Sequence, residues 1–229
     1  MLTAPAVLTD ARRRTLHRRI RLIVAATITY NLMEAVIAIS AGTAASSAAL
    51  IGFGLDSAIE VLSAAAVAWQ FTRRDPERWE KSTLRVIAIA FFALAVYVTV
   101  TSILSLLGAE RPEHSAVGLV LTAVSVIVMP FLSLAERRAG TEAGSATAVA
   151  DSMQTLICAY LSVAVLLGLA LNSLFRWWWA DAVAGLIIAA FAVREGVEAW
   201  RGDACATSVG MLMEEEHTDD QHDHSRRDR

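Results

Sequence analysis

Six long apolar stretches divide this chain of 229 residues and constrain its fold more than any other feature. A helix needs roughly 20 mostly apolar residues to cross a hydrocarbon core of about 30 Å. Because lipid offers no hydrogen bonds to the backbone, spans of this length are expected to be helical. We therefore predict an all-α fold, a six-helix transmembrane bundle with disordered termini. The predicted spans are Leu22–Gly42, Ser47–Phe71, Val86–Leu107, Ser115–Ala135, Ala146–Asn172 and Trp177–Trp200.

The charged residues divide the chain into three parts. They make up only 19% of the sequence, against about 25% in soluble domains. A basic segment at 1–21 precedes the transmembrane domain at 22–200, and a short acidic tail that contains histidine follows at 201–229. The third and fourth spans contain no charged residue, whereas the other four contain acidic residues.

Arginine and lysine cluster on alternate connections between the spans. They precede the first span, follow the last, and lie between the second and third and between the fourth and fifth. By the positive-inside rule, both ends of the chain face the cytoplasm. The basic N-terminal segment is thereby explained as an orientation signal, so we expect no nucleic acid partner. We expect an integral membrane protein in a bacterial plasma membrane.

Asp56 and Glu60 are unusual because they lie near the middle of the second span. A charged side chain at this depth costs about 2.5–3.5 kcal/mol on insertion scales. Their spacing of four residues puts both on one helix face, about 6 Å apart along the axis. Two such carboxylates are tolerated when a cation lies between them or when one is protonated. The pair therefore indicates a proton-coupled cation site, or alternatively hydrogen bonds that only hold the bundle together.

The fifth span offers a second polar stripe that could face this pair. Asp151, Gln154, Thr155 and Cys158 recur at helical spacing and share one face. Carboxylate and thiolate ligands from two helices suit a four-coordinate Zn²⁺ ion, and a thiolate disfavours Mg²⁺ and Ca²⁺. A buried cysteine can also be a packing residue, and a buried glutamine can be an interhelical hydrogen-bond donor.

A second group of polar residues supplies further candidates. Asn31 and Glu34 lie in the first span, and Glu34 is deep enough for a proton relay or an entry ligand. Asp181 follows the tryptophans at the start of the sixth span, where a structural role is equally consistent. Together with Asp151, these residues form a possible second tier of the site.

Three motifs in this order resemble the transmembrane domain of the cation diffusion facilitator (cation efflux) superfamily. They are SSAALIGFGLDSAIE at Ser46–Glu60, ADSMQ at Ala150–Gln154 and WADA at Trp179–Ala182. The resemblance implies exchange of a divalent metal, most often zinc, for protons. It also implies a homodimer and a cytosolic domain after the sixth helix, which the short segment Gly202–Arg229 does not provide.

The resemblance implies four metal ligands, two on the second helix and two on the fifth. On this chain they fall on Asp56, Glu60, Gln154 and Cys158, although the family usually has histidine and aspartate at the last two positions. Zinc is the expected cargo, with cadmium, cobalt, iron, manganese or nickel as alternatives. No prosthetic group is expected.

We therefore predict a membrane transporter that exports divalent metal cations from the cytoplasm by proton antiport. Two alternatives remain open: a proton-coupled exporter of small organic cations, and a metal-binding membrane scaffold or sensor that does not transport. An enzyme is not expected, because the sequence contains no HExxH motif, no glycine-rich phosphate loop and no nucleophile–base pair.

Overall fold

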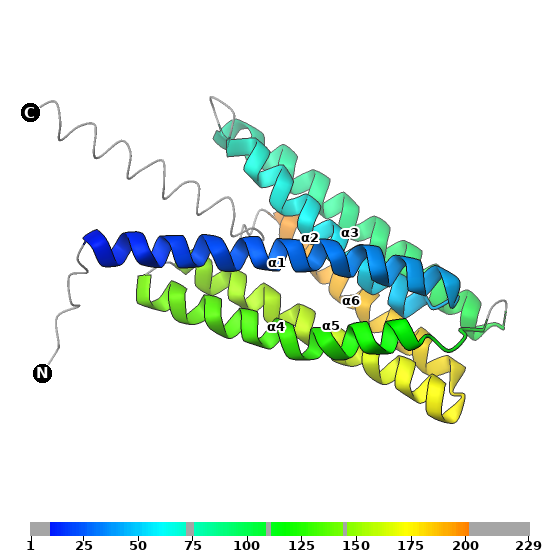
Figure 1. The fold of residues 1–229 in the computed structure, drawn as a ribbon. Helices are drawn as coiled ribbons and strands as arrows, with labels where there is room; N and C mark the ends of the chain where they lie inside the picture. Colours follow the sequence, from blue (N-terminus) through cyan, green and yellow to red (C-terminus); the bar gives the residue numbers. More distant parts are fainter. Residues whose placement is uncertain (1–9, 72–75, 109–110, 144–145, 202–229) are drawn as a thin grey trace, which may run out of the picture.

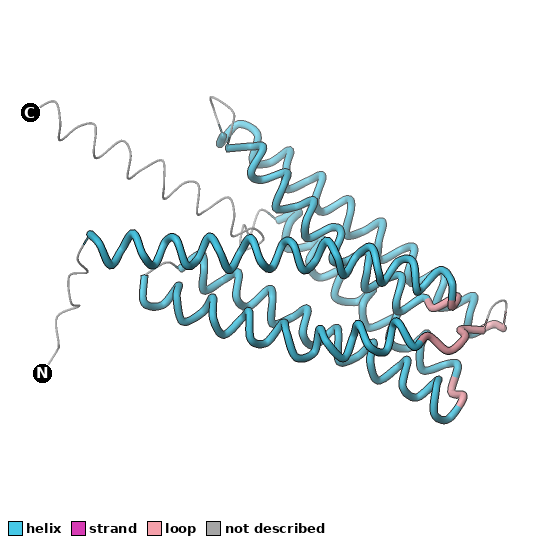
Figure 2. The backbone as a smooth tube through the Cα atoms, in the orientation of Figure 1, coloured by secondary structure: helices cyan, strands magenta, loops and turns pink. Residues whose placement is uncertain are grey.

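Helices make up nearly all of the chain that the structure describes (Figure 1). The computed structural model describes residues 10–71, 76–108, 111–143 and 146–201. Successive helices run in opposite directions along the bundle, and no strand occurs within these ranges (Figure 2). The predicted all-α, six-helix fold is confirmed. The helices are α1 (Asp10–Ala44), α2 (Ala48–Phe71), α3 (Pro76–Leu106), α4 (Ala116–Ala143), α5 (Ala146–Phe175) and α6 (Trp178–Arg201).

Five of these helices are long and apolar enough to cross a membrane: Arg18–Ala44, Ala48–Ala66, Lys81–Leu106, Ala116–Glu142 and Gln154–Phe175. The remaining helix, α6, has 24 residues but carries charged side chains toward both of its ends. Two of them, Asp181 and Glu195, are buried in the bundle. The other helices therefore shield the acidic face of α6 from lipid, as an integral membrane protein requires.

Several helices extend past the predicted spans. The first helix begins at Asp10 instead of Leu22, and its buried Leu16 and Ile20 show that this extension packs within the bundle. The fourth span reaches Glu142, and the third begins at Lys81. The charged residues Lys81 and Glu142 thus lie beyond the uncharged stretches Val86–Leu107 and Ser115–Ala135, because hydrogen bonding continues a helix beyond its apolar stretch.

α2 is the most connected helix of the bundle. It packs against α1, α3, α5 and α6. The other helices contact one another in the order α1, α4, α5, α6 and α3. Phe53 of α2 is fully buried in a cluster that also contains Ala38, Leu161 and Ile188 from three other helices. Toward the end where α1 begins, α2 and α3 diverge from α1, α4 and α5 (Figure 1).

Gly54 lets α2 approach α1 closely. A Cβ atom at this position would lie 2.9 Å from the Ile39 backbone nitrogen and 2.9 Å from the Ala38 Cβ atom. Small residues are common where membrane helices meet, because packing replaces the hydrophobic driving force that lipid removes. The α1–α2 contact therefore depends on the absence of a side chain here.

Gly54→Leu should separate α1 from α2 and destabilise the bundle by about 1–3 kcal/mol, the usual cost of overpacking. We expect a lower Tm in thermal unfolding of the detergent-solubilised protein. Ala65→Leu is the matched control, since Ala65 lies on the same helix with its side chain exposed. Equal Tm values for the two variants would contradict this account of the α1–α2 contact.

Candidate metal centre

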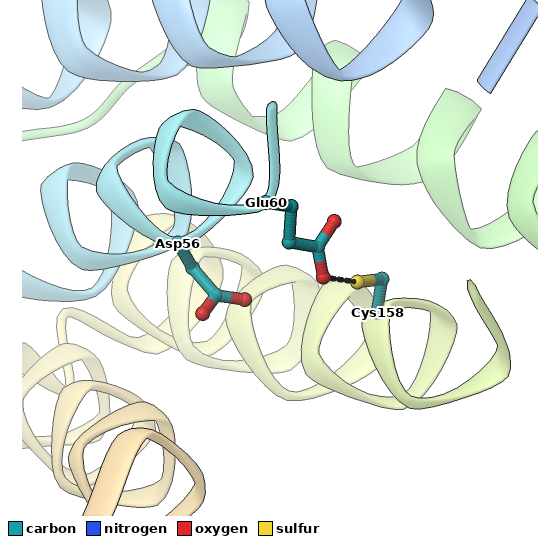
Figure 3. Close-up of side chains that lie close together, drawn as sticks. All are labelled: Asp56, Glu60 and Cys158. Carbon is teal, nitrogen blue, oxygen red and sulfur yellow. Dashed lines mark hydrogen bonds between the residues drawn. The ribbon is translucent and has the colours of Figure 1, made fainter. Parts of the chain in front are cut away.

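Asp56 and Glu60 of α2 meet Cys158 of α5 inside the bundle (Figure 3). One ligand atom from each residue lies within 4.8 Å of the others. Asp56 is 7% exposed and Cys158 is 5% exposed, while Glu60 is half-buried. The four-residue spacing on α2 turns both carboxylates toward α5, where Cys158 provides the opposing atom. The sequence-predicted residues Asp56, Glu60 and Cys158 thus form one cluster.

Both carboxylate oxygens of Glu60 accept a hydrogen bond. The Cys158 thiol donates to Oε1 with an Sγ–Oε1 distance of 2.6 Å, and the Asn31 amide donates to Oε2 at 2.7 Å. The Asn31 Oδ1 atom is buried and has no hydrogen-bond partner within the described part of the chain. Asn31, predicted as a second-tier residue, therefore joins α1 to the centre.

The cluster is close to the dimensions that a metal ion needs. In a tetrahedral zinc site with Zn–S of about 2.3 Å and Zn–O of about 2.0–2.2 Å, neighbouring ligand atoms lie about 3.5 Å apart. Here the three ligand atoms lie within 4.8 Å of one another, while the thiol and the Glu60 carboxylate are closer together than a shared ion would leave them. Asp56 would have to move inward, and the other two side chains apart, for all three to hold one ion.

Gln154 lies one turn before Cys158 on α5, and its side chain hydrogen-bonds Glu195 of α6. Glu195 is 9% exposed and interacts electrostatically with Asp56. Sequence reasoning missed Glu195, because its neighbour Arg194 marks this segment as the cytoplasmic end of the helix. A usable signal was present: Glu195 shares a face of α6 with Asp181, Ile188 and Ala192 at helical spacing.

Glu34 of α1 lies beside the centre in a separate group of hydroxyls. It is 1% exposed and accepts hydrogen bonds from Ser57 of α2, at 2.8 Å, and from Ser125 of α4. The Tyr30 hydroxyl contacts Ser125 at 2.8 Å. Glu34 was predicted from its depth, whereas its three hydroxyl neighbours were not, because single serines and tyrosines in a span carry no distinctive pattern.

Asp181, another second-tier candidate, lies in the first turn of α6 and contacts the start of α2. Its carboxylate accepts a hydrogen bond from Ser47 at 2.5 Å and one from the Ala49 backbone at 3.4 Å. Ser47 in turn accepts from the Leu50 backbone at 3.1 Å, so the two side chains cap the helix together. From these capping contacts we expect Asp181 to have a structural role. The side chain of Asp151 lies outside the described part of the structure.

Asp181→Ala should lower stability by about 1–3 kcal/mol, because it leaves buried donors at the start of α2 without an acceptor. We expect a lower Tm for the solubilised protein and an unchanged affinity for zinc in calorimetric titration. A loss of zinc affinity without a change in Tm would instead place Asp181 in the binding machinery.

Comparison with known proteins agrees with this architecture. A profile of the cation efflux transmembrane domain matches residues 22–202. The cation-efflux pump FieF of Shewanella oneidensis is 33% identical over 86 residues, which are 38% of this chain and 29% of that protein. The chain thus aligns with less than a third of that relative's length. Since the family match extends from the apolar part of α1 to the end of α6, the chain belongs to the cation efflux family.

Proposed function

We propose that the chain is a membrane transporter that moves a divalent metal cation out of the cytoplasm in exchange for protons. The observation that carries this proposal is the cluster of Asp56, Glu60 and Cys158, whose ligand atoms lie within 4.8 Å of one another between α2 and α5. Family membership supports a transport role, and the relative from Shewanella oneidensis is named as a cation-efflux pump.

The donor set favours a metal that accepts sulfur. Two carboxylates and one thiolate would carry three negative charges, which a divalent cation offsets better than a monovalent one. A thiolate ligand favours zinc or cadmium over the harder manganese, and cobalt, iron and nickel are intermediate candidates. We propose Gln154 for the fourth position, since it lies one turn from Cys158 and would exchange its bond to Glu195 for the metal.

Proton exchange follows from the contact between Cys158 and Glu60. The Cys158 thiol donates a hydrogen bond to Glu60 Oε1, and this contact suits a shared proton better than two anions, which would repel each other. A metal bound by both groups must displace that proton, since thiolate and carboxylate are the ligating forms. Metal and proton therefore compete for the same atoms, which is the minimal requirement for antiport.

The membrane setting is part of the same proposal. We place the protein in a bacterial plasma membrane with both ends in the cytoplasm, on the distribution of arginine and lysine. A homodimer is the proposed assembly, as the family resemblance implies. The acidic tail lies outside the described residues and has no assigned part in the exchange.

Asp56→Asn should abolish zinc transport, because it removes one of the ligand charges while keeping the side-chain shape. The measurement is zinc uptake into liposomes that contain the purified full-length chain, driven by an imposed pH gradient. Glu113→Gln is the control, since it makes the same chemical change at an exposed carboxylate. Unchanged zinc uptake by Asp56→Asn would refute the site, and uptake of organic cations alone would support the alternative cargo.

Cys158→Ser should change metal preference more than it changes folding. We expect zinc and cadmium affinity to fall by more than about 100-fold, since even partners beyond the ligands cost about 10–100-fold. Manganese affinity should fall far less, because manganese gains little from sulfur. Calorimetric titration with each metal measures this, with Cys205→Ser as the control. Parallel losses for all metals would contradict a ligating thiolate.

A further inference from the structure

A buried carboxylate lies outside the metal centre and has only hydroxyl partners. Glu34 oxygens contact Ser57 of α2 and Ser125 of α4, and Ser125 contacts Tyr30. No lysine, arginine or histidine of the described residues pairs with Glu34. Because a fully buried, unpaired carboxylate is costly, a group in this position is held by the donors around it or by a proton.

The hydrogen bonds around Glu34 suit both its ionised and its protonated form. Ser57 Oγ lies 2.8 Å from Glu34 Oε2 and 3.2 Å from the Phe53 carbonyl oxygen, yet a hydroxyl has one hydrogen to donate. With Glu34 ionised, that hydrogen points to Oε2. With Glu34 protonated, the acid donates to Ser57, and Ser57 donates to the Phe53 carbonyl. One proton and one hydroxyl rotation interconvert the two arrangements.

Ser125 completes this arrangement from α4. Its Oγ atom contacts Glu34 Oε1 and lies 3.0 Å from the Leu121 carbonyl oxygen and 2.8 Å from the Tyr30 hydroxyl. Tyr30 can donate to Ser125 while Ser125 donates to Glu34, in either protonation state. Each hydroxyl of the network therefore keeps a hydrogen-bond partner whether Glu34 is protonated or ionised.

Glu34 is linked to the metal centre without touching it. Asn31, one turn away on α1, donates to Glu60, and Ser57 directly follows Asp56. Electrostatic interaction connects Glu34 with both Asp56 and Cys158. The ionisable groups that face this region are Tyr30 on α1, Asp56 and Glu60 on α2 and Cys158 on α5, while Ser125 of α4 contributes only a hydroxyl. A cation at the centre would favour the ionised form of Glu34.

We propose that Glu34 is a proton-binding site separate from the metal ligands, which loses its proton when a divalent cation binds at Asp56, Glu60 and Cys158. This inference rests on the proposed metal–proton exchange and adds a second proton to it. On metal binding, the Oε2–H bond breaks, the proton leaves to water and the Ser57 hydrogen turns to Oε2. When the cation leaves, Glu34 takes up a proton again.

The test counts the protons released per zinc ion bound by the purified full-length chain in weakly buffered detergent solution, over a series of pH values. Glu34→Gln should still bind zinc but release about one proton fewer than the wild type, since one carboxyl group has been removed. Glu113→Gln, the same change at an exposed position, should match the wild type. Equal proton release by Glu34→Gln and wild type would overturn the inference.

A second variant covers the case in which Glu34→Gln does not fold. Ser125→Ala removes a donor to the ionised form and should move proton release to higher pH while one zinc ion still binds. An unmoved pH profile for Ser125→Ala would also overturn the role of Glu34. Failure of the wild-type chain to bind zinc at all is a different result, since it would refute the proposed metal exchange itself.

Discussion

Buried carboxylates inside a lipid-facing bundle restrict how its helices can be arranged. A helix in lipid forms all of its backbone hydrogen bonds within itself, but an acidic side chain needs hydrogen-bond donors from neighbouring helices. Here Glu34 is met by hydroxyls of α2 and α4, Glu60 by an amide of α1 and a thiol of α5, and Asp181 by a hydroxyl and a backbone amide at the start of α2. These contacts tie the helices together at positions where apolar packing alone would allow rotation or sliding.

α2 takes part in most of these polar contacts. Its first turn is capped by Ser47 and Asp181, its middle holds Asp56 and Glu60, and Ser57 connects it to α1. A shift of α2 relative to α1 or α5 would therefore break polar contacts at the centre and at Glu34 together. For that reason we expect charge at the centre to be coupled to the position of α2, and the proposed exchange would need such coupling to make binding on one side differ from binding on the other.

Much of the fold followed from hydropathy, and the errors have identifiable causes. The six apolar stretches became six helices, but α1 begins at Asp10 and α4 continues to Ala143, since a helical backbone persists where hydropathy ends. The acidic pair was identified from its depth and spacing, and Cys158 from its place on a polar stripe. Gln154 was predicted as a ligand beside Cys158, and its hydrogen bond to Glu195 was not foreseen because Glu195 lies beside Arg194 near the helix end.

The helical character of each span and the shared face of Asp56 and Glu60 can be predicted from the sequence alone, because both depend on local hydrogen bonding and helical period. Three contacts depend on the packing of the whole bundle: Asn31 reaches Glu60, Glu195 lies near Asp56, and Ser125 completes the surroundings of Glu34. In each case the two neighbours come from different helices. Their meeting depends on how each helix is rotated and how closely small residues such as Gly54 let it approach, and neither quantity is encoded within a single span.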